Sequence, residues 1–323
     1  YGVNLSGMDL TNTILRGANL TGANLYGVNL SGMDLTNTIL RGANLTGANL
    51  TGTTLTGMDL TSTILRGANL TGATLTGMDL TNANLAGQDL SDHNLMDVIL
   101  TGADLSNSVL PDYGLSGKNF DNSVFDGVDL SGKDLSHSDF RHASFKNTNL
   151  KNANLQAAEF LEVDLTKIKN KSLAGANLIG TAIPYSNLSG INLDGSILGF
   201  LNWQNSNLSG VDFTVISNKF IEASVLRGAN LSNTNFEGIM FSNKDEQGQM
   251  EYYELKITNG AYLANKSLAE ISEELKKVGS FGNWVTEKKV VGNDLLVKFI
   301  RYNDFEKANL HNANLSNADL TSA

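Results

Sequence analysis

The sequence predicts an all-β solenoid interrupted by a small α/β insert, and three observations support this. Residues 26–50 repeat residues 1–25 letter for letter, and residues 51–75 repeat them with a few changes. A shorter period of five runs inside each copy: a small residue, Asn or Asp, Leu, Ser or Thr, then often Gly. The central Leu or Phe recurs from Leu5 to Leu165 without a slip. A fixed short period of this kind indicates a repeat architecture.

Each position of the five-residue unit has an expected role. The period fits neither the alternation of a strand nor the 3.6-residue turn of a helix, but it suits a short extended piece followed by a bend. We expect the central residue to point inward. The residue two before it also points inward and must be small, while the other three face water. Gly at the last position suits a bend with positive φ.

These A(D/N)LxG units resemble those of the pentapeptide-repeat family. The resemblance implies a right-handed, four-sided parallel β-helix with four units, or 20 residues, in each coil. Phe120, Phe140 and Phe160 are all central residues spaced by 20. Four units per coil would therefore stack them as an aromatic ladder on one face.

Three residues depart from the pattern. Lys118 and Lys133 occupy the small inward position, two before Phe120 and Leu135. We expect their side chains to reach outward to water or the coil to widen locally. Trp203 takes a central position, where its indole N–H needs a partner if it is buried.

Two interruptions, each with three extra residues, lie at residues 166–172 and 214–220 and predict bulged corners. Loops that leave a regular scaffold often carry binding residues. Tolerated sequence drift is the alternative explanation. The candidate contact residues of these corner loops are Lys167, Lys169, Asn170, Ser217 and Asn218.

Composition changes at residues 243–302, so we divide the chain into a β-helix at 1–242, an inserted module at 243–302 and a resumed β-helix at 303–323. The insert predicts a strand at 251–258, a helix that Ser267 and Glu270 begin with a capping box and Gly279 ends, and a hairpin at 288–302. Its candidate interaction residues are Tyr252, Tyr253, Trp284, Phe299 and Tyr302.

No catalytic motif stands out, and the sequence predicts a non-enzymatic protein without catalytic residues, metal or cofactor. The chain has no cysteine, and its net charge of −10 disfavours direct nucleic-acid binding while permitting a basic partner. His137 and His142 are expected on the solvated surface. No apolar run reaches the ~18 residues of a membrane span. An extracellular or cell-surface location is favoured over a cytoplasmic one.

Two functions remain open. Solenoids normally need polar caps, and this chain begins and ends in repeat, so either it is part of a longer protein or its ends meet neighbours. The first hypothesis is a structural rod that stacks head to tail into a filament displaying the insert. The alternative is a protein-binding scaffold, including a DNA-mimicking, gyrase-binding member of the family. Against that member stand the missing C-terminal helix and an N-terminal third rich in Asn and Thr. The expected end-to-end contacts are Leu5, Leu10, Leu15, Leu310, Leu315 and Leu320.

Overall fold

The computed structural model describes residues 2–55, 58–219, 221, 223–241, 253–257, 266–272, 282–291, 294–303, 305, 307–316 and 318. The chain divides into two compact units, Tyr1–Ser172 and Leu173–Ala323. Each unit is described by itself.

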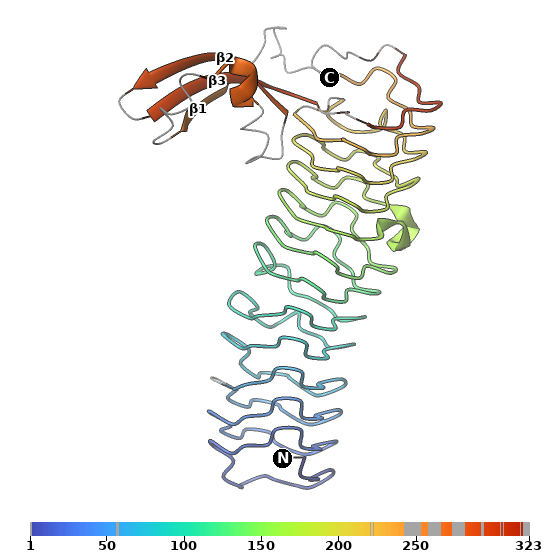
Figure 1. The fold of residues 1–323 in the computed structure, drawn as a ribbon. Helices are drawn as coiled ribbons and strands as arrows, with labels where there is room; N and C mark the ends of the chain where they lie inside the picture. Colours follow the sequence, from blue (N-terminus) through green and yellow to red (C-terminus); the bar gives the residue numbers. More distant parts are fainter. Residues whose placement is uncertain are drawn as a thin grey trace. The chain divides into compact units, whose positions relative to one another are not determined.

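The first unit is a stack of 20-residue coils. Parallel bridges join residues 20 apart, as between Asn24 and Asn44 and between Asn44 and Ile64. Four units of five residues therefore complete one coil, as the family resemblance implies. Figure 1 shows these coils of the first unit, in blue to green, lying one above another.

The backbone hydrogen bonds explain why the unit has five positions. The central residue donates to the coil that follows, as Leu25 N does to Asn44 O at 2.8 Å, and the residue before it donates to the coil that precedes. The central carbonyl accepts from the amide three residues on, closing a turn. The third turn residue has positive φ, 66° at Gly22 and 56° at Asn82, as a type II turn requires. The predicted bend is thus confirmed.

One amide per unit, that of the residue after the centre, has no backbone partner in this scheme. The Asn or Asp side chain before the centre accepts from it, as when Thr46 N donates to Asn44 Oδ1 at 3.0 Å. This is the Asx turn, in which a side chain replaces a backbone acceptor. The sequence analysis assigned this residue only to the water-facing surface, so its structural role was missed.

The core consists of the central and small residues, as expected. Central residues such as Leu25 and Leu45 are fully buried, and so are small residues such as Ala23 and Ala43. The predicted aromatic ladder is confirmed by stacked rings. Phe140 lies 5.3 Å from Phe120 and 5.1 Å from Phe160 between ring centroids, with interplanar angles of 9° and 21°.

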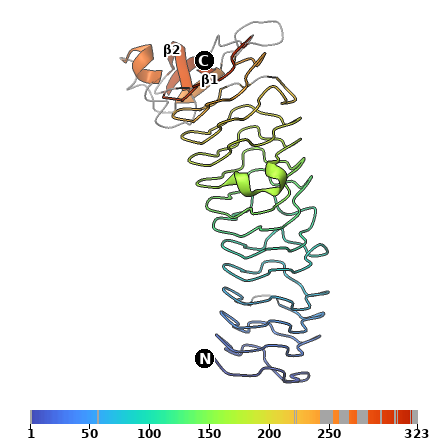
Figure 2. The same ribbon diagram turned by 90° about the vertical axis from the view of Figure 1, so that its right-hand side faces the viewer.

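The first interruption forms two 3-10 turns, η1 (Leu165–Lys167) and η2 (Lys169–Lys171), which Figure 2 shows at the edge of the stack. Ile168 between them is buried. Asn147 N donates to Lys167 O, and Lys169 N donates to Thr148 O. The corner is therefore bulged, as predicted, but its backbone remains bonded to the preceding coil.

The second unit forms a ladder of the same kind, with bridges between residues 20 apart such as Asn187 and Asn207. After the second interruption the bridges join residues 23 apart, as between Asn207 and Asn230. The side-chain amide of Asn218 bonds both to the carbonyl and to the amide of Leu198. Trp203 is fully buried, and its indole donates to Thr181 Oγ1 at 3.2 Å, which provides the expected partner.

A much larger insertion also leaves the ladder in register. Asn230 bridges Asn309 and Asn235 bridges Asn314, so 59 residues are added to the normal spacing of 20. The chain between contains β1 (Tyr253–Ile257), β2 (Gly282–Val291) and β3 (Asp294–Tyr302). These form an antiparallel sheet in the order β1-β3-β2, with an irregularity in β2 between Val285 and Glu287.

Other details of this segment can be compared with the sequence. A helical turn at 268–272 begins with the capping box: Ser267 N donates to Glu270 Oε2 at 2.7 Å, and Glu270 N to Ser267 Oγ at 3.2 Å. Strand β2 begins at Gly282, six residues before the predicted hairpin. The predicted helix end at Gly279 and the domain boundary at 242/243 lie outside the described residues.

The side chain of Asn303 forms three hydrogen bonds at the point where the chain rejoins the ladder. Its side-chain amide donates to Phe241 O at 2.7 Å and to Ile221 O at 3.1 Å, and its oxygen accepts from Ser224 N at 2.9 Å. The residue is 1% exposed. One side chain thus satisfies three backbone groups from separate segments of the second unit.

Candidate binding sites on the first unit

Large polar side chains replace the small inward residue at four positions of the first unit. Where this residue is Ser or Thr, its hydroxyl donates to a central carbonyl of its own coil or of the coil before, as Thr63 Oγ1 does to Leu40 O at 3.0 Å. The longer side chains also donate to carbonyls of the preceding coil, but they need more room. The four residues are Gln88, His93, Lys118 and Lys133.

Gln88 and His93 lie where two neighbouring coils lose their ladder. Gln88 Nε2 donates to Leu65 O at 2.5 Å, and His93 Nε2 lies 3.1 Å from Leu70 O. Bridges form on either side, but Asn69 and Asp89 form none with each other in this fully described stretch. The two coils are therefore separated from each other beside these oversized inward residues.

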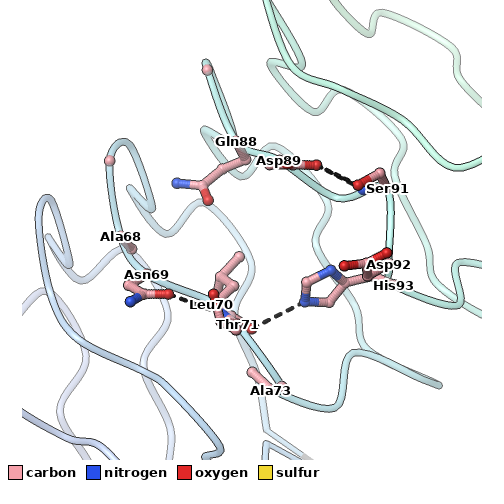
Figure 3. A pocket seen from close by; sticks show the side chains of 13 residues that line it. Ala68, Asn69, Leu70, Thr71, Ala73, Gln88, Asp89, Ser91, Asp92 and His93 are labelled. Atoms are coloured by element: carbon pink, nitrogen blue, oxygen red, sulfur yellow. Dashed lines mark hydrogen bonds between the residues drawn. The ribbon is translucent and has the colours of Figure 1, made fainter.

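The separated coils enclose a slot of about 630 Å³. Residues 67–73 line one side and residues 87–93, except Leu90, line the other (Figure 3). Leu50 N and Gly52 N donate to the coil of residues 67–73, but Leu70 N and Gly72 N do not donate to the coil of residues 87–93. The slot is therefore lined by backbone groups that pair with the next coil elsewhere in the unit.

His93 is the least satisfied side chain of the slot. It is 8% exposed, and its Nδ1 has no hydrogen-bond partner. Because the Leu70 carbonyl can only accept, Nε2 carries the proton that it shares with that oxygen. In the neutral ring, Nδ1 is then a buried acceptor without a donor. Figure 3 shows the ring reaching across the slot toward Leu70 and Thr71.

Two exposed carboxylates, Asp89 and Asp92, also line the slot. The hydroxyl and amide of Ser91 both donate to Asp89 Oδ1, at 2.6 and 3.1 Å. These hydrogen bonds hold the pKa of Asp89 below its usual value, so its charge is kept at neutral pH. Asp92 occupies a turn position with ordinary φ, where Asn82 and Asn107 have positive φ. The turn before His93 therefore keeps its closing hydrogen bond, from His93 N to Leu90 O at 2.9 Å, but lacks the positive φ of the regular turn.

A second irregularity lies at residues 111–114, and Lys118 and Lys133 bond to groups around it. Lys118 is 9% exposed, and its Nζ donates to Val98 O at 2.8 Å and to Met96 O at 3.0 Å. Burial lowers the pKa of Lys118. Of the two expectations, an outward-reaching side chain is wrong for Lys118, because carbonyls of the preceding coil accept its hydrogen bonds. Ile99 and Asn119 form no bridge in this described stretch, so the two coils are separated here.

Lys133 follows the expectation more closely. Its Nζ donates to Leu110 O and Pro111 O and forms an ion pair with exposed Asp112 at 2.7 Å. Hydrogen bonding to the lysine holds the pKa of Asp112 below its usual value. The lysine thus bonds to a bend at residues 112–114, which replaces the regular turn of the other units.

Apolar side chains are exposed around this bend. Met96 is 63% exposed, Ile99 50% and Tyr113 54%. Gly114 brings the two segments together, because a β-carbon at this residue would lie only 3.1 Å from Met96 N. Tyr113 occupies the inward position of its unit in the sequence but is turned to solvent. We call Met96, Ile99, Asp112 and Tyr113 the bend surface.

The structure places the predicted end contacts as follows. Leu10 is buried, Leu5, Leu15 and Leu315 are half-buried, and Leu310 is 37% exposed. Leu320 lies outside the described residues.

The sheet brings some of the predicted insert contacts together, since Tyr253 pairs with Phe299 and Trp284 pairs with the neighbouring Ile300. Tyr302 lies opposite Gly282, and Tyr252 lies outside the described residues. In the corner loops, Lys167, Lys169, Asn170 and Ser217 are exposed and Asn218 is half-buried.

The slot was not predicted from the sequence, although two residues indicate it. Gln88 and His93 precede Leu90 and Leu95 by two, which is the same departure that singled out Lys118. Within the described part of the chain, no cluster of three or more His, Asp or Glu side chains could hold a metal ion. A search of the same residues finds no helix suited to crossing a membrane.

The family model of pentapeptide repeats matches in eight copies, over residues 4–42, 38–77, 79–111, 115–141, 134–169, 186–214 and 304–323, which is well over half of the chain. The chain belongs to the pentapeptide-repeat family. Its fold is accordingly the right-handed, four-sided parallel β-helix that the sequence predicts.

Several solved structures of the family are similar to this chain. HetL, involved in heterocyst differentiation regulation in the cyanobacterium Nostoc, is 19% identical, with 96% of this chain and 92% of HetL covered and a TM-score of 0.30. QnrB1, a plasmid-mediated fluoroquinolone resistance protein, is 18% identical over 62% and 89%, with a TM-score of 0.28. Rfr23 from the cyanobacterium Cyanothece is 37% identical over 33% and 60%, with a TM-score of 0.20. No curated protein matches the chain.

Proposed function

We propose that this pentapeptide-repeat protein is a non-enzymatic scaffold whose first unit binds a protein partner through the bend surface. The observation that carries the proposal is the exposure of Met96, Ile99 and Tyr113 around one immobilised bend. Large apolar and aromatic side chains of this kind dominate binding energy when a partner covers them. Pentapeptide-repeat proteins are in general structural or binding proteins, which agrees with this assignment.

The bend is ordered before any partner arrives. Lys118 bonds the carbonyls of Met96 and Val98, and Lys133 bonds those of Leu110 and Pro111. A surface that is already fixed loses little conformational entropy on binding. Exposed Asp112, paired with Lys133, gives this apolar surface a polar rim.

The test is cross-linking and affinity capture from the native host with three forms of the chain. The wild type and a Tyr26→Ser control, which changes an equally exposed tyrosine of the same unit, should recover the same partner. A Met96→Ser/Tyr113→Ser double variant should lose it, while its thermal unfolding stays unchanged. Equal recovery by all three forms would contradict the proposal.

A second candidate is end-to-end assembly. Val3 and Met8 are 45% and 49% exposed on the first coil, whereas Ala23 and Val28 at the same positions one coil later are fully buried. We propose that another coil covers them, from a second molecule or from further repeats of the same protein. Electron microscopy and light scattering of the native protein distinguish fibres from discrete particles. Fibres that persist in a Val3→Lys/Met8→Lys variant would argue against this contact.

The DNA-mimic hypothesis is tested separately by a gyrase supercoiling assay.

A further inference from the structure

The slot between residues 67–73 and 87–93 contains groups that call for a hydrogen-bond donor. His93 Nδ1 is a buried acceptor without a partner. The carboxylates of Asp89 and Asp92 line the same slot, and no lysine or arginine lines it. A buried acceptor without a partner has lost its hydrogen bonds to water without replacement, so a ligand that donates to it gains affinity. The slot therefore favours a cationic donor over an anion.

The same protein shows which group fills such openings elsewhere. The ammonium of Lys118 donates to two carbonyls of the preceding coil. The ammonium of Lys133 donates to two carbonyls and to the carboxylate of Asp112. An opened coil of this chain therefore accepts an ammonium on backbone and carboxylate oxygens. The slot at His93 has the acceptors of this arrangement but no ammonium of its own.

We propose that the slot binds a primary ammonium group. Its three N–H donors match the acceptors available: the unpaired Nδ1 of His93, the carboxylate of Asp89 and the carboxylate of Asp92. Asp89 uses Oδ1 for its two bonds with Ser91, which leaves Oδ2 for the ligand. The ammonium comes from a lysine side chain of a protein or from a small free amine. This inference is independent of the proposed function, because the bend surface lies outside the slot.

The experiment uses the full chain, titrated with four probes and followed by NMR of the His93 imidazole nitrogens. The probes are cadaverine, Nα-acetyl-lysine methylamide, its Nε-acetylated form, and a lysine-containing peptide. The amine probes should shift the Nδ1 resonance of His93 in a saturable way. The Nε-acetylated form, which lacks the ammonium, should bind at least ten-fold more weakly. A preference for the peptide over cadaverine identifies a protein as the source, and the reverse identifies a free amine.

Matched variants complete the design. Asp89→Asn and Asp92→Asn keep the shape of the site and should each weaken amine binding about ten-fold, because each removes one charge. A His137→Asn control changes an exposed histidine at a turn where Asn is common, and it should leave binding unchanged. Equal binding of the acetylated and free amines, or a His93 signal that responds to no probe because a water occupies the slot, overturns the proposal.

Discussion

Replacing Asn303 by alanine tests how the return of the chain is held. The change removes three hydrogen bonds of 2.7, 2.9 and 3.1 Å, and the side chain that makes them is 1% exposed. Water cannot easily replace bonds at such a depth. Each buried backbone group left without a partner costs about 1–3 kcal/mol, so we expect Asn303→Ala to lower the free energy of unfolding of the second unit by roughly 3–5 kcal/mol.

Two further variants separate hydrogen bonding from packing. Asn303→Asp keeps an acceptor for Ser224 N but cannot donate to the carbonyls of Ile221 and Phe241, and it buries a charge beside them. Its loss should equal or exceed that of alanine. Asn309→Ala is the control, because exposed Asn309 sits in the same resumed repeat and its side chain bonds only neighbouring surface groups. The control should cost no more than about 1 kcal/mol.

The assay is native-state hydrogen exchange combined with urea unfolding. Solenoids can open in parts, so a single unfolding midpoint can hide a local loss. Two amides report on the contacts around Asn303. The Ser224 amide donates to Asn303 itself, and the Asn309 amide donates to Ala229 O in the repeat that follows. Both should exchange faster in Asn303→Ala. If Asn303→Ala costs no more than Asn309→Ala, the reasoning is refuted.

Three further predictions concern the first unit. Phe140→Ala should lower stability by about 3–5 kcal/mol, and Phe140→Leu by clearly less, because leucine is a normal central residue; equal losses in urea unfolding would contradict this. The hydroxyl of Ser131 donates to Asp129 and holds the pKa of this carboxyl below 3.8. The ionised carboxylate therefore stabilises the folded chain above pH 3.8, and this contribution is lost as the pH falls through the folded-state pKa. Asp129→Asn should therefore show a smaller decrease of the unfolding temperature at acid pH than the wild type. Burial lowers the pKa of Lys118 below 10.5, so the unfolded chain holds more protons just below that pH. Stability should therefore rise with pH toward 10.5 in the wild type but not in Lys118→Met, and parallel profiles would contradict this.

Much of the fold could be predicted because each unit repeats the same local problem. A leucine every five residues with a small residue two before it defines what is buried, whatever the neighbours are. The role of Asn and Asp was less visible, since a sequence shows the preference for these residues but not the amide they serve. Counting backbone donors per unit reveals it, because every buried amide must find a partner. Thr46 N and Asn44 illustrate the point.

The candidate sites depended on a competition that the sequence alone does not decide. A long polar side chain at the inward position can leave the core or separate the coils. Lys118 stays inside because the carbonyls of Met96 and Val98 accept hydrogen bonds from its ammonium. His93 stays inside because the carbonyl of Leu70 accepts a hydrogen bond from its ring. The side chain of Tyr113 is instead turned out of the core to solvent, and Gly114 adopts the positive φ that the bend requires. Which carbonyls are free to accept is known only once the coils are in place.

The ladder itself explains where such a protein can vary. The bonds that hold the coils together run between neighbouring coils, through bridges that join residues 20 apart, whereas the turn bonds stay within each unit. An insertion at a corner therefore disturbs only the bonds beside it: three extra residues turn the spacing of 20 into 23, and 59 extra residues turn it into 79, while the bridges on both sides persist. An oversized inward residue, in contrast, breaks bonds between two coils and exposes backbone groups to a ligand. Corners can thus add whole segments at little cost to the stack, whereas the inward position creates binding chemistry within it, and the slot beside His93 is an instance of the second route.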